Sequence, residues 1–285
     1  MSVSIAHLGP SGTYAEAATL AYIRNFGTDE ASKSLLCPCP SIAQTLYSVA
    51  QGEANLAVVP VENSIEGSVV ITLDLLWQLD TLQIQQALIL PIRHTLLSRS
   101  STLEAIKTVY SHPQALAQCQ RWLEKFLPGV QLMPTNSTTE ALHYLDEDHT
   151  AGAIASERAA QLYNLPVIAS AINDYPDNCT RFLVLGKQPS TGGSHTSLAF
   201  STPANVPGAL VKPLQVFAER GINMSRIESR PTKRSLGEYL FFIDIEADAS
   251  QVSIQAALEE VASYTEILKI FGSYSVLSID LGREG

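Results

Sequence analysis

Short apolar runs alternate with amphipathic stretches along the first part of the chain. Residues 3–8, 55–59 and 153–155 have the length and the apolar content of buried strands. A stretch with a helical spacing of apolar side chains follows such runs, as in residues 14–23. This repeated order of strand and helix predicts an α/β fold with parallel or mixed sheets that carry helices on both faces.

The apolar stretch at residues 82–97 is long and extended, and Pro91 interrupts it. We interpret it as a crossover that leaves a first lobe near residue 80, with a return near residue 170. Two lobes of this kind enclose a cleft, where small-molecule sites commonly form. Polar turns at the ends of the expected strands would line that cleft, namely residues 9–13, 62–67, 111–114, 156 and 180–182.

A second pattern begins after the Gly- and Ser-rich segment 188–194, which is typical of a linker. Strand-like alternation and helical spacing then predict the order β-α-β-β-α-β, which is the ferredoxin-like arrangement. The expected domains are therefore residues 1–187 and residues 195–285, joined by that linker. Within the first domain, we expect lobe one at residues 1–80 and 170–187 and lobe two at residues 81–169.

Composition narrows the classes of function. Apolar residues make up 46% of the chain and charged residues 16%, which is enough apolar material for a sizeable core. The formal net charge is −10, so we expect neither nucleic acid nor a membrane as a partner, although a cleft can still bind a small anion. No run approaches the ~20 apolar residues of a membrane helix, and no export signal is visible, so we expect a cytoplasmic protein.

Four cysteines are scattered along the chain, and of these Cys37 and Cys39 form a close pair. A structural zinc site needs four ligands, so we expect no bound metal. Free thiols are typical of a reducing compartment, which agrees with the expected cytoplasmic location.

The strongest candidate chemistry lies at residues 178–182, where Thr180 and Arg181 open an apolar run. Adjacent residues of a strand point to opposite faces, so these two side chains should diverge. Arginine can grip a carboxylate with two parallel hydrogen bonds, and threonine can hydrogen-bond a leaving oxygen. The alternative is an ordinary one, in which Arg181 pairs with a surface acid and Thr180 only starts the strand.

Two other polar turns carry candidate groups. The loop 9–13 could present backbone N–H groups to an anion at the start of a helix, although an ordinary strand-to-helix turn fits it equally well. His112 precedes Pro113, which suits the first position of a helix. This histidine is a candidate proton carrier, and a helix-capping role is an equal alternative.

The first domain carries five motifs: LGPSGTY at 8–14, VPVENSIEG at 59–67, SHPQA at 111–115, AIAS at 153–156 and NCTRF at 178–182. The second domain carries PGAL at 207–210 and ESRP at 228–231. Together they resemble the prephenate dehydratase family with a C-terminal ACT regulatory domain, in the form without a chorismate mutase part. The resemblance covers nearly the whole chain and implies a two-lobed, periplasmic-binding-protein-like catalytic domain with mixed sheets.

This resemblance implies a carbon–oxygen lyase that converts prephenate to phenylpyruvate, water and carbon dioxide without a cofactor. It implies catalytic roles for Thr180, which would serve the departing hydroxyl, for Arg181, which would grip a carboxylate, and for His112. The expected substrate contacts are Thr13, Asn63, Ser64, Gly67, Gln114, Ser156 and Phe182. The same chemistry on the aminated substrate, arogenate, stays open, as does a two-lobed sensor without chemistry.

The resemblance also implies that the ACT domain binds L-phenylalanine as a feedback effector in the biosynthesis of that amino acid. The expected effector contacts are Gly208, Ala209, Leu210, Asn223 and Met224. The helix beside them is expected to open at Pro207, or later because Pro213 would otherwise interrupt it. We expect a homodimer or homotetramer formed through the ACT domain, and the alternative is that this domain serves dimerisation alone.

Overall fold

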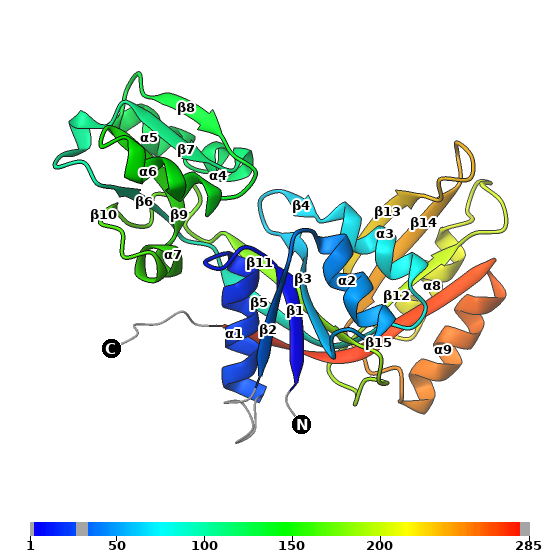
Figure 1. Cartoon of the computed structure of the whole chain (residues 1–285). Helices are drawn as coiled ribbons and strands as arrows, with labels where there is room; N and C mark the ends of the chain where they lie inside the picture. Colours follow the sequence, from blue (N-terminus) through cyan, green and yellow to red (C-terminus); the bar gives the residue numbers. More distant parts are fainter. Residues whose placement is uncertain (1–2, 27–33, 280–285) are drawn as a thin grey trace.

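The structure is a computed structural model that describes residues 3–26 and 34–279. The outer limits predicted for the two domains, residues 1 and 285, lie outside these ranges. Figure 1 shows three bodies, which are two lobes and a C-terminal domain that lies beside lobe one. No helix within residues 3–26 and 34–279 is long and apolar enough to cross a membrane.

Lobe one forms around part of a ten-stranded sheet. Helix α1 (Tyr14–Phe26) covers one face, and helices α2 (Ile42–Gln51) and α3 (Val70–Gln78) cover the other, with an apolar core on each side (Figure 1). Its strands, in the order of the sheet, are β5 (Gln83–Pro91), β11 (Cys179–Gly186), β3 (Leu56–Asn63), β1 (Ser4–Leu8) and β2 (Leu35–Cys39), with the short β4 (Gly67–Ser68) paired to β3.

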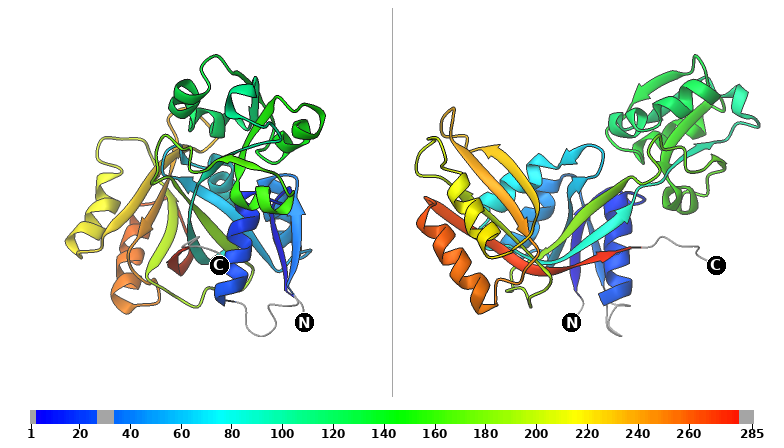
Figure 2. Two further views of the ribbon diagram at one scale, coloured as in Figure 1. Left: turned by 90° about the vertical axis from the view of Figure 1, so that its left-hand side faces the viewer. Right: turned by 180° about the vertical axis from the view of Figure 1, so that it is seen from behind.

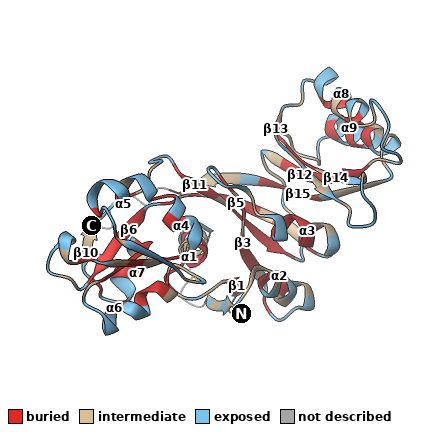
Figure 3. Ribbon diagram, turned by 90° about the horizontal axis from the view of Figure 1, so that it is seen from above, coloured by how far each residue is buried: buried red, intermediate tan, exposed pale blue. Residues whose placement is uncertain are grey.

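Strand β11 lies at the centre of this lobe and pairs antiparallel with both β3 and β5. Because successive side chains of a strand point to opposite faces, Phe182 packs on the α1 side and Leu183 packs on the α2 and α3 side. Figure 3 shows this central part of the sheet as buried. The same alternation separates Thr180 from Arg181 at the start of the strand, as predicted.

Lobe two is built on a separate five-stranded sheet. Its strands, in order, are β10 (Val167–Ala169), β6 (His94–Ser98), β9 (Ala151–Ser156), β7 (Thr108–Ser111) and β8 (Gln131–Pro134). Its helical segments are η2 (Leu103–Ala105), α4 (Pro113–Ala117), α5 (Gln120–Phe126), η3 (Glu140–His143), α6 (Tyr144–Glu147) and α7 (Glu157–Leu162). Both crossings between the lobes lie roughly ten residues later than predicted, because β5 pairs with β11 along its length and so belongs to lobe one.

The C-terminal domain follows the predicted order β-α-β-β-α-β. Its elements are β12 (His195–Ser201), α8 (Val211–Glu219), β13 (Met224–Pro231), β14 (Tyr239–Ile245), α9 (Val252–Ser263) and β15 (Ile267–Ser278). Both helices lie on one face of its sheet (Figures 1 and 2), over a core that includes Phe200 and Phe217. Helix α8 begins after Pro207, which places Pro213 in its first turn, where no helical hydrogen bond is lost.

Strand β15 joins the two domains, whereas the sequence predicted a self-contained block behind a linker. Its first part pairs with β12, and Ser275 to Ser278 pair parallel with β5 of lobe one. Figure 2 shows this strand running from one domain into the other. The linker also contacts lobe one, because the Gln188 carbonyl oxygen accepts a hydrogen bond from Gln85 Nε2 on β5 (2.6 Å). The strands of lobe one and of the C-terminal domain therefore form one continuous sheet of ten strands.

The passage of β15 from its pairing with β12 to its pairing with β5 requires a glycine at position 272. Gly272 has φ = +127°, and a Cβ added there would lie 2.8 Å from the carbonyl oxygen of Ile84 on β5. That oxygen belongs to the backbone of a paired strand, so it cannot turn aside as a side chain can. Glycine therefore permits the C-terminal domain to approach lobe one this closely.

We predict that Gly272→Ala destabilises the protein by about 1–3 kcal/mol more than Gly129→Ala, because overpacking adds to the backbone strain. Gly129 also has a left-handed backbone (φ = +84°), but a Cβ there would meet no atom within 4 Å, so it serves as the control. Urea denaturation followed by circular dichroism measures both losses. Equal losses would show that the close contact at Gly272 has no cost.

Candidate active site

A cleft of about 1210 Å³ lies where the two lobes meet. Lobe one contributes the loop between β1 and α1 and the ends of β3 and β11. Lobe two contributes the start of α4 and the segment that leads into η3. The cleft thus lies beyond the carboxyl ends of β1 and β3, where ligands bind in open α/β sheets.

The structure brings predicted residues from both lobes to this cleft. Those that line it are Thr13, Asn63, His112, Gln114, Thr180 and Phe182. The other predicted residues, Ser64, Gly67, Ser156 and Arg181, lie outside its lining. Polar lining residues that the sequence reasoning missed are Tyr14, His94, Gln118, Asn136, Ser137, Thr138, Glu140, His143 and Tyr163.

Thr180 and Asn63 face each other on neighbouring strands. They are register partners in the β11–β3 pair, both are buried, and Asn63 Nδ2 donates to Thr180 Oγ1 at 2.9 Å. The Asn63 amide has one orientation, because its Oδ1 accepts from the backbone N–H groups of Ile65 and Glu66, each at 3.0 Å. With its oxygen held as an acceptor, the Thr180 hydroxyl has its proton available for a ligand in the cleft.

A chain of side-chain hydrogen bonds continues from Asn63 into lobe two. Asn63 Nδ2 also donates to Asn178 Oδ1 (2.8 Å), and Asn178 Nδ2 donates to Gln118 Oε1 (2.9 Å). Gln118 Oε1 lies 3.0 Å from His94 Nε2. An amide oxygen can only accept, so His94 carries a proton on Nε2 and donates it. The fixed direction of the Asn63 amide therefore sets every donor and acceptor along this chain.

His94 lies beside Tyr14, whose hydroxyl is 3.2 Å from His94 Nδ1 and donates to the Arg93 carbonyl oxygen (2.7 Å). Burial lowers the pKa of His94 from its ordinary value of 6.5, and the hydrogen bond with Gln118 opposes this lowering. Burial also raises the pKa of the Tyr14 hydroxyl. Both side chains are therefore neutral near pH 7.

The sequence contains only weak signals for this chain of residues. Asn178 lies in the motif that drew attention to Thr180, but its own role was not predicted. Gln118 lies four positions after Gln114, a spacing that places two side chains on one helical face. The bonded pairs are 24, 60 and 115 positions apart along the chain. The fold, and not a local pattern, brings them together.

Arg181 does not reach the cleft, which corrects the prediction that it grips a substrate carboxylate. Its side chain leaves β11 on the face opposite Thr180, and the guanidinium forms ion pairs with Glu62 and with Asp244 of the C-terminal domain. In the second pair, Nη1 and Oδ2 are 3.0 Å apart. The alternative prediction, in which Arg181 pairs with a surface acid, is closer to what is observed. The observed pair with Asp244 is, however, largely buried and joins two domains.

Three other predicted residues lie outside the lining and hold segments that border the cleft, namely Ser64, Gly67 and Ser156. Ser64 Oγ accepts from Cys179 N (3.0 Å), which holds the turn after β3 to the start of β11. Gly67 has φ = +81° and closes the hairpin of β3 and β4. Ser156 Oγ donates to the carbonyl oxygen of Gly12 (2.7 Å), which links lobe two to the loop of lobe one.

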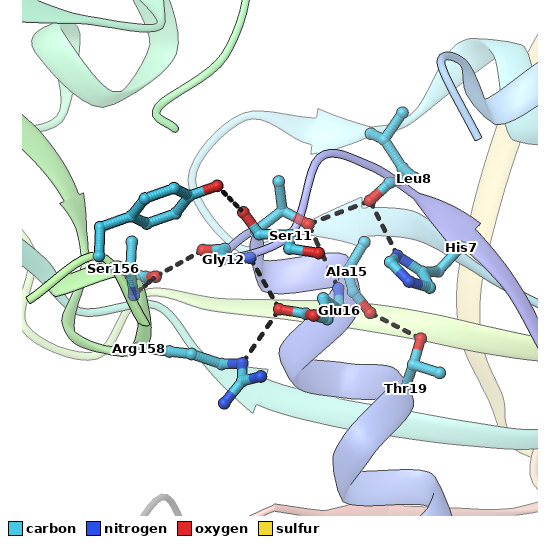
Figure 4. A network of polar contacts seen from close by, with 12 residues as sticks. His7, Leu8, Ser11, Gly12, Ala15, Glu16, Thr19, Ser156 and Arg158 are labelled. Atoms are coloured by element: carbon cyan, nitrogen blue, oxygen red, sulfur yellow. Dashed lines mark hydrogen bonds and ion pairs between the residues drawn. The ribbon is translucent and has the colours of Figure 1, made fainter. Parts of the chain in front are cut away.

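Figure 4 shows how lobe two holds the loop between β1 and α1. The Glu16 carboxylate accepts from Gly12 N (2.7 Å) and from Arg158 Nε of lobe two (3.0 Å). Burial by itself would raise the pKa of Glu16, but the Gly12 N–H group and the Arg158 guanidinium lower it below its ordinary value, so this carboxylate is ionised. The conformation of the loop therefore depends on contacts from both lobes.

His112 lines the cleft and also caps α4, so its two predicted roles are compatible. Its Nδ1 accepts from Gln114 N at 3.3 Å, which makes Nε2 the protonated nitrogen of the neutral ring. Burial lowers the pKa of His112. His112 therefore offers the cleft an N–H donor and not a positive charge.

Neutral donors dominate the lining of the cleft. Neither lysine nor arginine lines it in the described part of the chain, and the Glu140 carboxylate accepts from Asn136 N (2.7 Å) and Nδ2 (3.2 Å). The Thr13 hydroxyl donates to the Leu8 carbonyl oxygen (3.0 Å), so an anion would be held by donors such as Gln114 and by the partial positive charge at the start of α1. Across residues 3–26 and 34–279, no group of three or more His, Cys, Asp or Glu side chains could hold a metal ion.

The predicted effector residues lie in the C-terminal domain. The turn before α8 contains Gly208 (φ = +84°), Ala209 and Leu210. Asn223 precedes β13, and Met224 packs against the core of the domain. Their part in effector binding stays a prediction.

The sequence matches two family models. The model described as "Prephenate dehydratase" matches residues 5–190, and the model described as "ACT domain" matches residues 196–263. The chain is 42% identical over 274 residues to a bifunctional chorismate mutase/prephenate dehydratase of Aquifex aeolicus, with 95% of this chain and 73% of the relative covered. It is 38% identical over 284 residues to a prephenate dehydratase of Methanocaldococcus jannaschii, with 97% and 99% covered.

A solved structure supports the same grouping. The prephenate dehydratase of Arthrobacter aurescens in complex with L-Phe matches with a TM-score of 0.86 and 36% identity, over 96% of this chain and 90% of that chain. The similarity thus extends over both lobes and the C-terminal domain. This chain therefore belongs to the prephenate dehydratase family, with a two-lobed, periplasmic-binding-protein-like catalytic domain and a C-terminal ACT domain.

Proposed function

We propose that this protein is a prephenate dehydratase, a carbon–oxygen lyase that converts prephenate to phenylpyruvate in the biosynthesis of L-phenylalanine. Membership of the family supports the reaction. The single observation that best supports the proposed active site is the Thr180 hydroxyl. Its oxygen accepts a hydrogen bond from Asn63, while its proton is available to the cleft.

The reaction breaks two bonds of the ring, one to the hydroxyl and one to the carboxylate. The electrons of the carbon–carbon bond enter the ring, which becomes aromatic, and carbon dioxide leaves uncharged. The hydroxyl leaves with the electrons of the carbon–oxygen bond and needs a proton to become water. We assign the stabilisation of this oxygen to a hydrogen bond from Thr180, which strengthens as negative charge develops. No cofactor is required, because the ring itself accepts the electrons.

The lining of the cleft contains neither lysine nor arginine in the part of the chain that is described, which suits a carboxylate that has to leave as carbon dioxide. An arginine fork on that carboxylate would stabilise the charge of the reactant, which the transition state disperses into the ring. The position of Arg181 on the other face of β11 agrees with this requirement. Donors such as His112 and Gln114 can hold the second carboxylate, on the pyruvyl side chain.

We predict that Thr180→Val lowers kcat for prephenate by more than about tenfold, because valine keeps the shape of the side chain and lacks the hydroxyl. Thr180→Ser keeps the hydroxyl and should retain most of the activity. KM should change less than kcat, since the contact matters most in the transition state. Steady-state kinetics give both constants, and an unchanged kcat in Thr180→Val would remove Thr180 from the reaction.

The buried His94 should make stability depend on pH. Its pKa in the folded state is lowered by burial, so below about pH 6.5 the unfolded chain takes up a proton that the folded protein resists. The folded state therefore loses stability as the pH falls from about 6.5 toward the lowered pKa, by at most about 1.36 kcal/mol per pH unit. This contribution is fully present above pH 6.5.

We predict that His94→Gln removes this contribution, so that Tm falls less in the variant than in the wild type between about pH 7.5 and about pH 5.5. Glutamine retains an N–H donor toward Gln118. Carboxylates such as Glu16 are present in both proteins, so they do not affect the comparison. Thermal unfolding across this range is the measurement, and parallel curves would exclude His94 as the source of the pH dependence.

We infer that L-phenylalanine is the effector and that the ACT domain binds it. A related prephenate dehydratase has been solved in complex with L-Phe, which supports this choice. The candidate contacts are Gly208, Ala209, Leu210, Asn223 and Met224. A homodimer or homotetramer formed through the ACT domain, and a cytoplasmic location, complete the proposal. The net charge of −10 disfavours nucleic acid and membranes as partners.

A turnover assay on prephenate and on arogenate, each with and without L-phenylalanine, tests the proposed function. We expect phenylpyruvate to form from prephenate and L-phenylalanine to suppress its formation. Faster formation of phenylalanine from arogenate would move the assignment to the aminated substrate. Binding of prephenate without product, measured by calorimetry, would instead indicate a two-lobed sensor.

A further inference from the structure

Two short segments face each other where β3 and β11 meet the cleft. Glu62-Asn63 on β3 pairs with Thr180-Arg181 on β11, with Thr180 opposite Asn63 and Arg181 opposite Glu62. In each segment, one side chain lies at the cleft and the other lies on the opposite face, toward the ACT domain. The residue proposed to act on the substrate is thus the direct neighbour of a charged residue that contacts the regulatory domain.

The charged residues on this face form a cluster of two acids and two arginines. Arg181 forms ion pairs with Glu62 and, at 3.0 Å, with Asp244 on β14. Arg226 on β13 lies 3.7 Å from Glu62 and 3.9 Å from Asp244, and it donates to Ser68 (2.7 Å). The side chains of Arg181, Arg226 and Asp244 are 14%, 7% and 6% exposed, so water and salt screen these charges weakly.

Asp244 is held in place within the ACT domain. Its Oδ1 accepts from Ser197 Oγ on β12 (2.5 Å), and the same hydroxyl lies 2.7 Å from the Tyr274 hydroxyl on β15. All three side chains are buried. Three strands of the ACT domain therefore hold the carboxylate that pairs with Arg181.

The start of β11 pairs regularly with β5, with Thr180 opposite Leu90 and Arg181 opposite Ile89, but its pairing with β3 is irregular. The register shifts between Arg181 and Phe182, so that Val61 of β3 is passed over. An irregularity of this kind bends a strand and re-aims its side chains. The β3 side is the one that carries Asn63, so the alignment of Thr180 with Asn63 is where a second contact, the ion pair of Arg181 with Asp244, can add to the ladder of backbone hydrogen bonds.

We propose that Arg181 is a positioning residue, anchored by Asp244 of the ACT domain, that aims the Thr180 hydroxyl at the leaving group of the substrate. Arg181 itself does not touch the substrate. The inference rests on the proposed dehydratase activity. It gives the ACT domain a part in the reaction itself, separate from the binding of an effector.

A second group of ion pairs crosses the same interface and provides a matched control. Asp74 on α3 pairs with Arg230 (3.4 Å) and with Lys233 (2.6 Å), both in the ACT domain. The Asp74 side chain is 10% exposed, close to the 6% of Asp244. Loss of either acid weakens the contact between domains, whereas loss of Asp244 in particular removes the partner of Arg181 in the ACT domain and leaves its pair with Glu62.

Kinetics of Asp244→Asn and Asp74→Asn in the full-length chain test the proposal. We expect Asp244→Asn to lower kcat for prephenate at least about tenfold with KM within about twofold of the wild type, and Asp74→Asn to keep both constants within about twofold. Arg181→Lys should retain more kcat than Arg181→Met, because lysine can still pair with Asp244. A wild-type kcat in Asp244→Asn, or equal losses in the two Asp variants, would overturn the proposal.

Methyl NMR of the threonine side chains provides a readout that does not depend on turnover. The Thr180 methyl resonance is assigned by its disappearance in Thr180→Ser, and the spectra also report whether each variant is folded. We expect Asp244→Asn to shift this resonance and Asp74→Asn to leave it in place. An unmoved resonance in Asp244→Asn would overturn the positioning role. Failure of the wild type to turn over prephenate would count against the proposed function instead.

Discussion

The antiparallel pairing of β11 with β3 is the constraint on which the site depends. It places Thr180 against Asn63, although 117 positions separate them along the chain. Two backbone N–H groups of the following turn hold the Asn63 oxygen, so the direction of this amide is fixed. That one dipole sets the donor and acceptor roles from Thr180 through Asn178 and Gln118 to His94.

The same pairing separates neutral hydrogen-bonding groups from charged ones. Neutral donors lie on the cleft face, where a carboxylate has to lose its charge as carbon dioxide. Arg181 and Arg226 lie on the other face, together with Glu62 and Asp244. Buried charges are tolerated there because each has a partner of opposite sign, whereas an unpaired one would carry a large desolvation cost.

The two lobes and the ACT domain are connected by more than the chain itself. Strand β15 extends the ACT sheet into lobe one, and Glu16 binds Arg158 across the lobes. Each connection acts on a segment that borders the cleft or pairs with one that does. The loop before α1 depends on lobe two, and the start of β11 contacts the ACT domain through Arg181.

Much of the fold and part of the site could be predicted from the sequence. The period of apolar residues predicted the α/β class and the order of elements in the ACT domain, because secondary structure follows local spacing. Polar residues at the ends of buried strands indicated that Thr180, Asn63 and His112 would line a cleft, which the structure shows. Gln118 and His94 were missed, because their partners lie far away along the chain.

The sequence by itself determined the family, the helices and strands, and the divergence of Thr180 from Arg181. The tertiary structure decided which of these two side chains faces the cleft, and it placed the end of β15 in lobe one. Alternation along a strand predicts that neighbouring side chains point to opposite faces, but it does not predict which face meets the other lobe. A shift of one residue in register exchanges the faces, and register is set by packing against distant strands, which no local pattern encodes.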